Sequence, residues 1–170
     1  MIILITGTPG TGKSSTVRSL SKKINKELIS INDLEGIYTG VDEERGSNIV
    51  DMKLLQDKLQ DMIKGDTIIE GHLSHLLPFG DIVIVLRTHP EELRGRLKER
   101  GFGKDKIQEN LEAEALDVCL IEALENHREV YEINTTEKSP EETATAITKI
   151  LGGKTDEFRP GKFDWSEEFF

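Results

Sequence analysis

Short apolar runs alternate with amphipathic segments along most of the chain. Met1–Thr6 and Asp81–Arg87 are almost purely apolar, as expected of central strands that are buried on both faces of a sheet. Three shorter runs predict further strands: Glu27–Ile31, Thr67–Glu70 and Val130–Asn134. Because helical segments separate these runs, the pattern predicts an α/β fold with a parallel sheet that is covered by helices on both faces.

Helical periodicity fills the intervals between the predicted strands. Apolar positions recur every three to four residues from about Lys13 to Lys23 and from Asp51 to Lys64. Another helix is expected to start at Pro90 and to break at Gly101-Phe102-Gly103. A longer helix is then expected from about Lys104 to Asn126.

The remaining segments differ in how clearly they predict structure. Ser139-Pro140-Glu141-Glu142 is a capping box with proline at the first helical position, which predicts a last helix that ends near Leu151. Residues 32–50 read as irregular, and residues 154–170 form an acidic, aromatic tail without clear periodicity. Since neither a repeat nor a linker divides the chain, we expect residues 1–170 to form a single domain.

Charge and composition indicate the setting in which the protein works. The net charge is −10, with 32 acidic and 22 basic residues, and such a surface disfavours broad binding to nucleic acids. One cysteine, Cys119, provides no disulfide framework. Met1–Ile5 is too short to span a membrane and lacks the charged flank of a secretion signal. We therefore expect a cytoplasmic protein that does not bind membranes.

The strongest chemical signal is a glycine-rich loop between the first predicted strand and helix. Gly7-Thr8-Pro9-Gly10-Thr11-Gly12-Lys13-Ser14 matches G-x-x-x-x-G-K-[ST] at every required position. Glycines let successive backbone N–H groups point into one concavity, and the helix start adds its free N–H groups. Lys13 is expected to reach the β- and γ-phosphates, Ser14 to bind Mg²⁺ and Ser15 to contact the α-phosphate. The loop therefore predicts a site for ATP and Mg²⁺.

Three classes of P-loop protein compete for this sequence. A regulatory GTPase needs a late Asn-Lys-x-Asp segment, which this chain lacks, and motor ATPases usually need more than 170 residues. A small-molecule kinase needs an acceptor segment and a cationic lid, and residues 32–50 and 99–106 fit these roles. Arg96 and Arg100 lie four residues apart on one helical face, where two guanidinium groups can grip phosphate oxygens.

Glu70-Gly71-His72 is a third group of candidate site residues, after the glycine loop and the lid arginines. Glu70 ends a predicted buried strand, which is where P-loop proteins hold Mg²⁺, usually through water. His72 is a candidate for orienting a water molecule or an acceptor phosphate. A kinase for a sugar or another small alcohol would need a catalytic base, for which His72 is the only nearby candidate. We rank a kinase for such an alcohol below a kinase whose acceptor is a phosphate group.

Together these segments resemble the adenylate kinase isoenzyme 6 family, atypical adenylate kinases that also act as ATPases in small-subunit ribosome assembly. The resemblance runs in order along about 150 residues, and its motifs are Thr6–Lys13, Asp33-Leu34, Asp42-Glu43-Glu44, Val83–Thr88, Arg100-Gly101-Phe102 and Asn110. It implies a P-loop kinase with a five-stranded parallel sheet. It also implies a segment that binds nucleoside monophosphates near residues 30–50 and a short lid near residues 99–109.

The resemblance also implies an activity, its cofactors and a partner. By motif match, the ATP contacts would be Gly10, Gly12, Lys13, Ser14, Ser15, Arg100 and Lys138. The implied reaction converts ATP and AMP, or another nucleoside monophosphate, to two diphosphates with Mg²⁺, beside slow ATP hydrolysis. The implied partner is a basic small-subunit ribosomal protein. The rival hypothesis is an ATP-driven ribosome-assembly switch in which AMP phosphorylation is incidental. Family members typically have Asp-x-His where this chain has Glu70-Gly71-His72.

Overall fold

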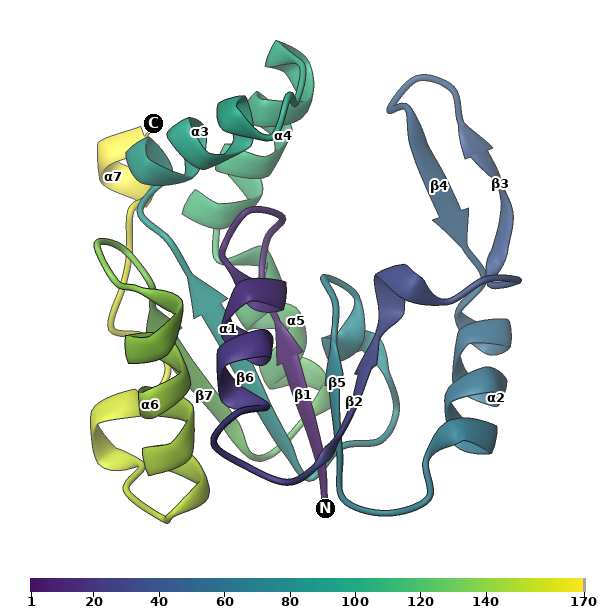
Figure 1. Ribbon diagram of the computed structural model, residues 1–170. Coiled ribbons are helices and arrows are strands. Elements are labelled where there is room, and N and C mark those ends of the chain that lie inside the picture. Colours follow the sequence, from purple (N-terminus) through teal and green to yellow (C-terminus); the bar gives the residue numbers. More distant parts are fainter. Residues whose placement is uncertain (170) are drawn as a thin grey trace.

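Five parallel strands form the centre of the computed structural model, which describes residues 1–169 (Figure 1). The spatial order is β2-β5-β1-β6-β7, so β1 is central and β6 lies directly beside it. The predicted parallel sheet is therefore confirmed. The strands are β1 (Ile2–Thr6), β2 (Glu27–Ser30), β5 (Thr67–Glu70), β6 (Ile82–Arg87) and β7 (Val130–Asn134).

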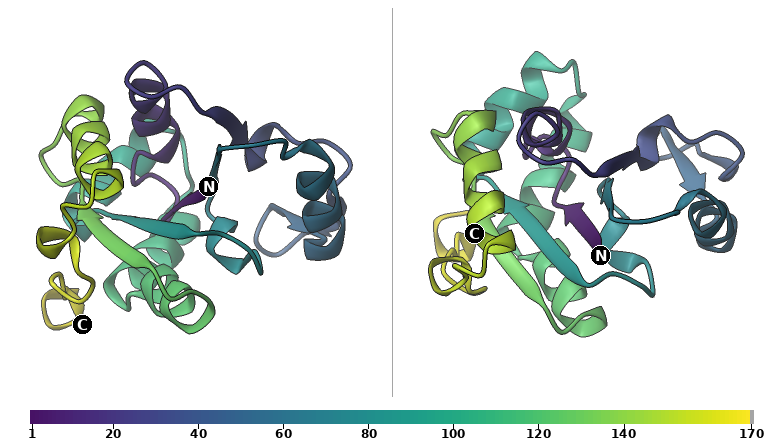
Figure 2. Two further views of the ribbon diagram at one scale, coloured as in Figure 1. Left: turned by 90° about the horizontal axis from the view of Figure 1, so that it is seen from below. Right: turned by 60° about the horizontal axis from the view of Figure 1, so that its bottom comes forward.

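Helices cover both faces of this sheet, as the alternation of elements predicts (Figure 2). Helices α1 (Lys13–Leu20) and α6 (Pro140–Leu151) pack on one face. Helices α2 (Met52–Met62) and α5 (Val118–Asn126) pack on the other. The capping box at Ser139 is present and begins α6, as predicted. Within the described residues, no helix is both long and apolar enough to cross a membrane.

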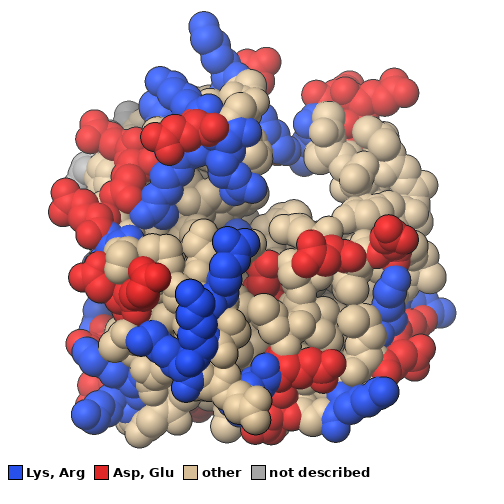
Figure 3. All heavy atoms as spheres, viewed as in Figure 1, with Lys and Arg blue, Asp and Glu red and all other residues tan. Residues whose placement is uncertain are grey.

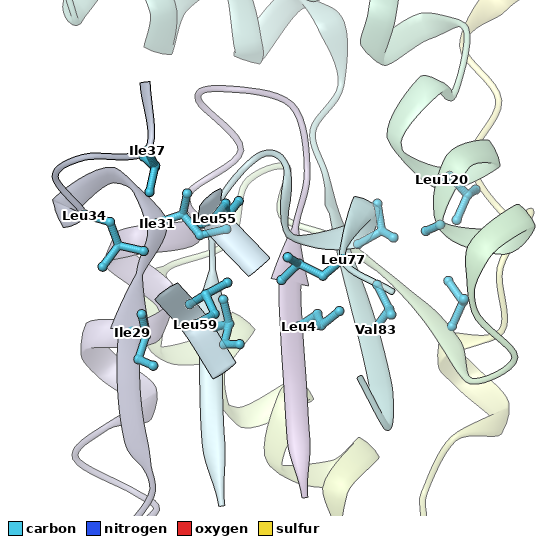
Figure 4. Packing of buried hydrophobic residues seen from close by; sticks show 14 residues of the cluster. Leu4, Ile29, Ile31, Leu34, Ile37, Leu55, Leu59, Leu77, Val83 and Leu120 are labelled. Atoms are coloured by element: carbon cyan, nitrogen blue, oxygen red, sulfur yellow. The ribbon is translucent and has the colours of Figure 1, made fainter. Parts of the chain in front are cut away.

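The two faces of the sheet divide the core into two clusters. Side chains alternate along a strand, so Leu4 faces one cluster while Ile3 and Ile5 face the other. Leu4 packs in the cluster with Leu59 of α2 and Leu120 of α5, as Figure 4 shows. Because both faces are buried, β1 carries no polar side chain before Thr6, and its carboxyl end is fixed by core packing.

A third apolar cluster lies above the carboxyl edge of the sheet. It joins α3 (Pro90–Glu99) to α4 (Lys104–Ala115), and its buried members are Leu93, Leu97, Ile107 and Leu111. Phe169, in the short helix α7 (Ser166–Phe169), packs against the same cluster. The helix pair therefore has a small core of its own. The described residues also contain three 3₁₀ turns: Ile31–Asp33, Ser74–Leu76 and Asp156–Phe158.

The expectation of one continuous helix over residues 104–126 is wrong. Asp117 has φ of 58°, in the left-handed region, and separates α4 from α5. A buried arginine explains the break, because Arg87 Nη2 donates to the carbonyl oxygen of Glu114 at 2.9 Å and to Asp117 Oδ1 at 2.5 Å. These contacts favour a turn at a position that helical periodicity alone would continue.

Residues 32–50 are also more regular than expected. They contain an antiparallel hairpin of β3 (Tyr38–Asp42) and β4 (Ser47–Val50), which stands apart from the main sheet (Figure 1). The sequence conceals this hairpin because only its base, at Val50, packs against a core cluster. Val41 is 60% exposed and Ile49 48% exposed, so no alternation of buried and solvated positions marks the strands.

Candidate active site

The glycine loop joins the carboxyl end of β1 to α1 and packs closely against its surroundings. Gly7 has φ of 142°, and a Cβ atom there would lie 2.4 Å from the carbonyl oxygen of Leu86. Gly10 has φ of 93°, and its Cβ would lie 2.8 Å from Cδ1 of Leu93 in α3. Glycine is therefore required at both positions by backbone conformation and by space.

Lys13 is buried, with 7% of its surface exposed, and its ammonium group turns back onto the loop. Nζ donates to the carbonyl oxygens of Gly7 at 2.8 Å and Thr8 at 3.0 Å. Burial lowers the pKa of Lys13 from 10.5 to about 8, while nearby Glu70 and Glu114 act in the opposite direction. The group thus remains mainly charged near neutral pH, beside the concave face of the loop.

Glu70 meets the loop at Ser14, as expected of the carboxyl end of a neighbouring parallel strand. Its Oε1 accepts hydrogen bonds from Ser14 Oγ at 3.1 Å and from Ser30 Oγ at 2.6 Å. Among the side chains that the structure describes, its Oε2 is the one buried nitrogen or oxygen without a hydrogen-bond partner. An unpartnered carboxylate oxygen beside a serine hydroxyl fits Mg²⁺ held with its own water molecules.

A cleft of about 470 Å³ opens above the loop and brings together residues from distant parts of the sequence. In Figure 3, basic side chains gather over α3 on one side of the opening, whereas acidic side chains mark the tip of the β3–β4 hairpin. All the candidate site residues except Glu70 line this cleft: Gly10, Gly12, Lys13, Ser14, Ser15, His72, Arg96, Arg100 and Lys138.

The two candidate lid arginines occupy different environments in the cleft. Arg96 is half-buried and held on both sides. Its Nη1 donates to the carbonyl oxygen of Gly10 at 3.4 Å, its Nη2 donates to the carbonyl oxygen of Thr135 at 3.0 Å, and it forms an ion pair with Glu92. Arg100 is exposed at the end of α3, with its guanidinium 5.4 Å from the ring centroid of Phe102. Arg96 is therefore preorganised against the loop, while Arg100 is free to reorient.

His72 and Lys138 also line the cleft. Solvent reaches the His72 ring, yet the surrounding walls desolvate it, and this effect together with the Lys13 charge lowers the pKa of His72 to about 4. The imidazole is therefore neutral near pH 7. Lys138 is exposed, in the turn that leads from β7 to α6.

The sequence of this chain matches a family model described as AAA domain over residues 3–117. That range covers the glycine loop, Glu70, helix α3 with Arg96, and Arg100 directly after the end of α3. The chain belongs to the AAA domain family.

Full-length relatives of this AAA domain protein occur in several archaea. A protein of Methanosarcina barkeri is 47% identical over 179 residues, with 97% of each chain covered. One from Pyrococcus furiosus is 43% identical over 171 residues, which cover 99% of this chain and 93% of the relative. One from Methanothermobacter thermautotrophicus is 47% identical over 169 residues, with 97% of each chain covered. All three carry the name "Putative adenylate kinase".

Solved structures place the AAA domain chain among P-loop kinase folds. A shikimate kinase from Acinetobacter baumannii in complex with shikimate superposes with a TM-score of 0.64, covering 90% of this chain and 93% of that one, at 16% identity. A deoxyadenosine kinase from M. mycoides superposes with a TM-score of 0.60, covering 91% and 100%, also at 16% identity. At such identity the likeness concerns the fold, and it confirms the predicted α/β P-loop kinase architecture.

Sequence reasoning missed other residues that line the cleft of this AAA domain protein. Thr135 follows β7 at the same edge of the sheet as the loop, and its Oγ1 donates to the carbonyl oxygen of Thr11 at 3.2 Å. Its position after a buried strand was a usable signal, because carboxyl ends of parallel strands form ligand sites. Asn32 and Glu99 lie in the predicted acceptor and lid segments but were not singled out, and Thr143 carries no comparable signal.

Proposed function

We propose that this protein is an ATP-dependent nucleoside monophosphate kinase that converts ATP and AMP to two ADP. The observation that carries the proposal is the single cleft in which the glycine loop, Arg96 and Arg100 face one volume. A phosphate-binding loop that faces cationic side chains across one cleft is the arrangement that phosphoryl transfer requires. The names of the archaeal relatives support the same reaction.

In this proposal the protein acts by positioning and by electrostatics. Lys13, Arg96 and Arg100 neutralise the charge that spreads over the transferred group. Ser14, and Glu70 through water, hold Mg²⁺, which when bound offsets the charge of the phosphate oxygens.

The acceptor needs little activation. A phosphate oxygen of the acceptor is already nucleophilic, so transfer proceeds in line without a covalent intermediate or a strong base. His72, neutral near pH 7, orients the acceptor phosphate or a water molecule by hydrogen bonding.

We assign acceptor binding to residues 30–50 and closure of the cleft to residues 99–109, within one domain of 170 residues. The β3–β4 hairpin and the α3–α4 pair lie on the two sides of the opening in Figure 3. One contact links the two sides, because Arg45 Nη1 lies 3.7 Å from Glu109 Oε1. Both side chains are exposed, at 66% and 44%, so this ion pair is weak and leaves the cleft able to open.

An acceptor screen tests the proposal. Purified protein with ATP and Mg²⁺ is expected to form ADP slowly alone and much faster with AMP, and a panel of other nucleoside monophosphates gives the order of preference. Formation of two ADP per AMP consumed identifies phosphoryl transfer to AMP and distinguishes it from hydrolysis of ATP. A faster rate with a sugar or another small alcohol than with every nucleoside monophosphate would contradict the proposal.

The same assay addresses the proposed link to ribosome maturation. We extend the proposal to ATP hydrolysis in the cytoplasm and to a basic small-subunit ribosomal protein as partner, because an acidic chain of net charge −10 suits a basic protein surface. ATP turnover that is insensitive to AMP but accelerates with such a protein or a pre-ribosomal particle would favour the rival, an assembly switch with incidental kinase activity.

Binding of ATP is expected to weaken at alkaline pH. Because burial lowers the pKa of Lys13 to about 8, the ammonium that faces the phosphates loses its proton above that pH in the free protein. The dissociation constant for ATP should then rise by up to about tenfold per pH unit, until the pH reaches the pKa of Lys13 in the complex. Calorimetric titration from neutral to alkaline pH measures this dependence.

Lys13→Arg provides the control for this dependence, since a guanidinium group stays protonated over the whole range. Its dissociation constant, although different in absolute value, should vary little with pH. A wild-type constant that stays flat above pH 8, or an arginine variant with the same slope as the wild type, would rule out Lys13 as the titrating group.

A further inference from the structure

A buried ionic cluster lies behind the cleft, and the proposed chemistry does not use it. Its centre is Arg87, at the end of β6, which is 1% exposed. The guanidinium donates from Nε to Glu114 Oε1 at 2.9 Å, from Nη1 to Glu132 Oε1 at 2.6 Å and from Nη2 to Asp117 Oδ1 at 2.5 Å. One arginine thus holds three carboxylates, from α4, the α4–α5 turn and β7.

Glu114 connects this cluster to the glycine loop. It is 1% exposed, and its Oε2 accepts a hydrogen bond from Thr8 Oγ1 at 2.5 Å. Its Oε1 accepts from the backbone N–H of Thr88 at 2.9 Å as well as from Arg87. The side chain of Thr8 therefore points away from the cleft, which it does not line, toward the helix that continues from the lid.

The backbone of Thr8 faces the opposite way and binds the loop lysine. Its carbonyl oxygen accepts from Lys13 Nζ at 3.0 Å and from Thr11 Oγ1 at 2.9 Å. Thr8 thus connects the two residues: its hydroxyl donates to Glu114, and its carbonyl oxygen accepts from Lys13. A shift of Lys13 toward a bound phosphate must break or move this contact, and Glu114 limits how far Thr8 can follow.

The C-terminal tail closes the other side of the cluster. The ring centroid of Trp165 lies 5.0 Å from the guanidinium carbon of Arg87, and Trp165 is 7% exposed. Glu132 Oε2 accepts hydrogen bonds from the backbone N–H groups of Gly161 at 2.9 Å and Lys162 at 3.2 Å. The tail is therefore anchored on the same ionic cluster that holds the loop.

We propose that Glu114 is a positioning residue for the nucleotide loop. It fixes Thr8, and through Thr8 the resting place of Lys13, and it transmits displacement of the loop to Arg87 and Trp165. The proposal rests on the proposed function in one respect, because it takes the loop as the site of ATP phosphates. It gives the tail a role in the site without any contact between the tail and the nucleotide.

Trp165 is the only tryptophan of the chain and does not line the cleft, so its fluorescence reports on this connection. Saturating ATP–Mg²⁺, or an analogue that is not hydrolysed, is expected to change the emission of the wild-type protein. In Thr8→Val, which removes the hydroxyl and keeps the branched shape, the change should be lost at saturation. The dissociation constant for ATP should rise by up to about tenfold, because a loop without this hydrogen bond must be ordered when ATP binds, and a hydrogen bond to a charged group sets the upper limit of that cost.

Two variants separate positioning from general structure. Thr8→Ser keeps the hydroxyl and should retain the emission change. Thr67→Val makes the same chemical change at another fully buried threonine, whose hydroxyl donates to the carbonyl oxygen of Gly65, and should retain both the emission change and the ATP affinity. If Thr8→Val does not fold, Glu114→Gln provides a second test, because its single acceptor oxygen cannot serve Thr8, Arg87 and Thr88 together.

Two results would overturn the role of Glu114: an emission change in Thr8→Val equal to that of the wild type, or equal loss in Thr8→Ser and Thr8→Val. Absence of any ATP-dependent change in the folded, ATP-binding wild type would overturn it as well. The proposed function fails by a different observation, since a chain that binds ATP but phosphorylates no nucleoside monophosphate contradicts the kinase and leaves the fluorescence result standing.

Discussion

Lys13→Met is expected to lower the rate of phosphoryl transfer at saturating substrates by about 100- to 1,000-fold, the cost of removing a preorganised charged donor from a transition state. Lys13 is buried and is held by two loop carbonyls, so solvent does not replace the missing ammonium group. Methionine keeps most of the aliphatic length and therefore fills the space. The rate of ADP formation from ATP and AMP at neutral pH measures the loss.

Lys22→Met is the matched control, because Lys22 lies just past the end of the same helix and is exposed. Its transfer rate should stay within about twofold of the wild type, since surface substitutions away from a site have small effects. If Lys13→Met kept more than about a tenth of wild-type transfer while remaining folded, Lys13 would not act on the transferred group.

The sequence was sufficient to predict the elements of the site whose positions follow from local rules. The glycine loop is a contiguous pattern, and its flanking strand and helix follow from the periodicity around it. The meeting of Ser14 with Glu70, 56 residues apart, also follows, because Glu70 ends β5 and the loop that leads to Ser14 starts at the carboxyl end of the neighbouring parallel strand β1. The two most apolar runs also predicted that β1 and β6 lie at the centre of the sheet, whereas the positions of the other three strands were not predicted.

The parts that could not be predicted depend on long-range contacts. The turn at Asp117 follows from a buried arginine 30 residues earlier, and helical periodicity contains no trace of it. The link from Thr8 to Glu114 spans 106 residues. Glu114 is fully buried, yet in the sequence it reads as one more charged position on a solvated helix. The same limit applies to the hairpin, whose strands lack a buried face that would set a pattern.

Glu70→Gln is expected to lower the transfer rate by about 10- to 100-fold and to raise the Mg²⁺ concentration needed for half-maximal rate, the usual cost of losing an outer-sphere metal partner. Glutamine has the same shape and can still accept from the hydroxyls of Ser14 and Ser30. What it lacks is the charge of the carboxylate and the free acceptor at Oε2. The substitution therefore weakens the binding of Mg²⁺, and excess Mg²⁺ should restore part of the rate.

A titration of transfer rate against Mg²⁺ separates this role from structural support. Glu27→Gln, at the exposed start of the neighbouring strand β2, makes the same chemical change away from the loop and should leave the Mg²⁺ dependence unaltered. Glu70→Asp keeps the charge on a shorter side chain, so its Mg²⁺ requirement should fall between those of the wild type and the glutamine variant. A Glu70→Gln protein with reduced rate but unchanged Mg²⁺ dependence would show that the carboxylate positions Ser14 and Ser30 and does not act through the cation.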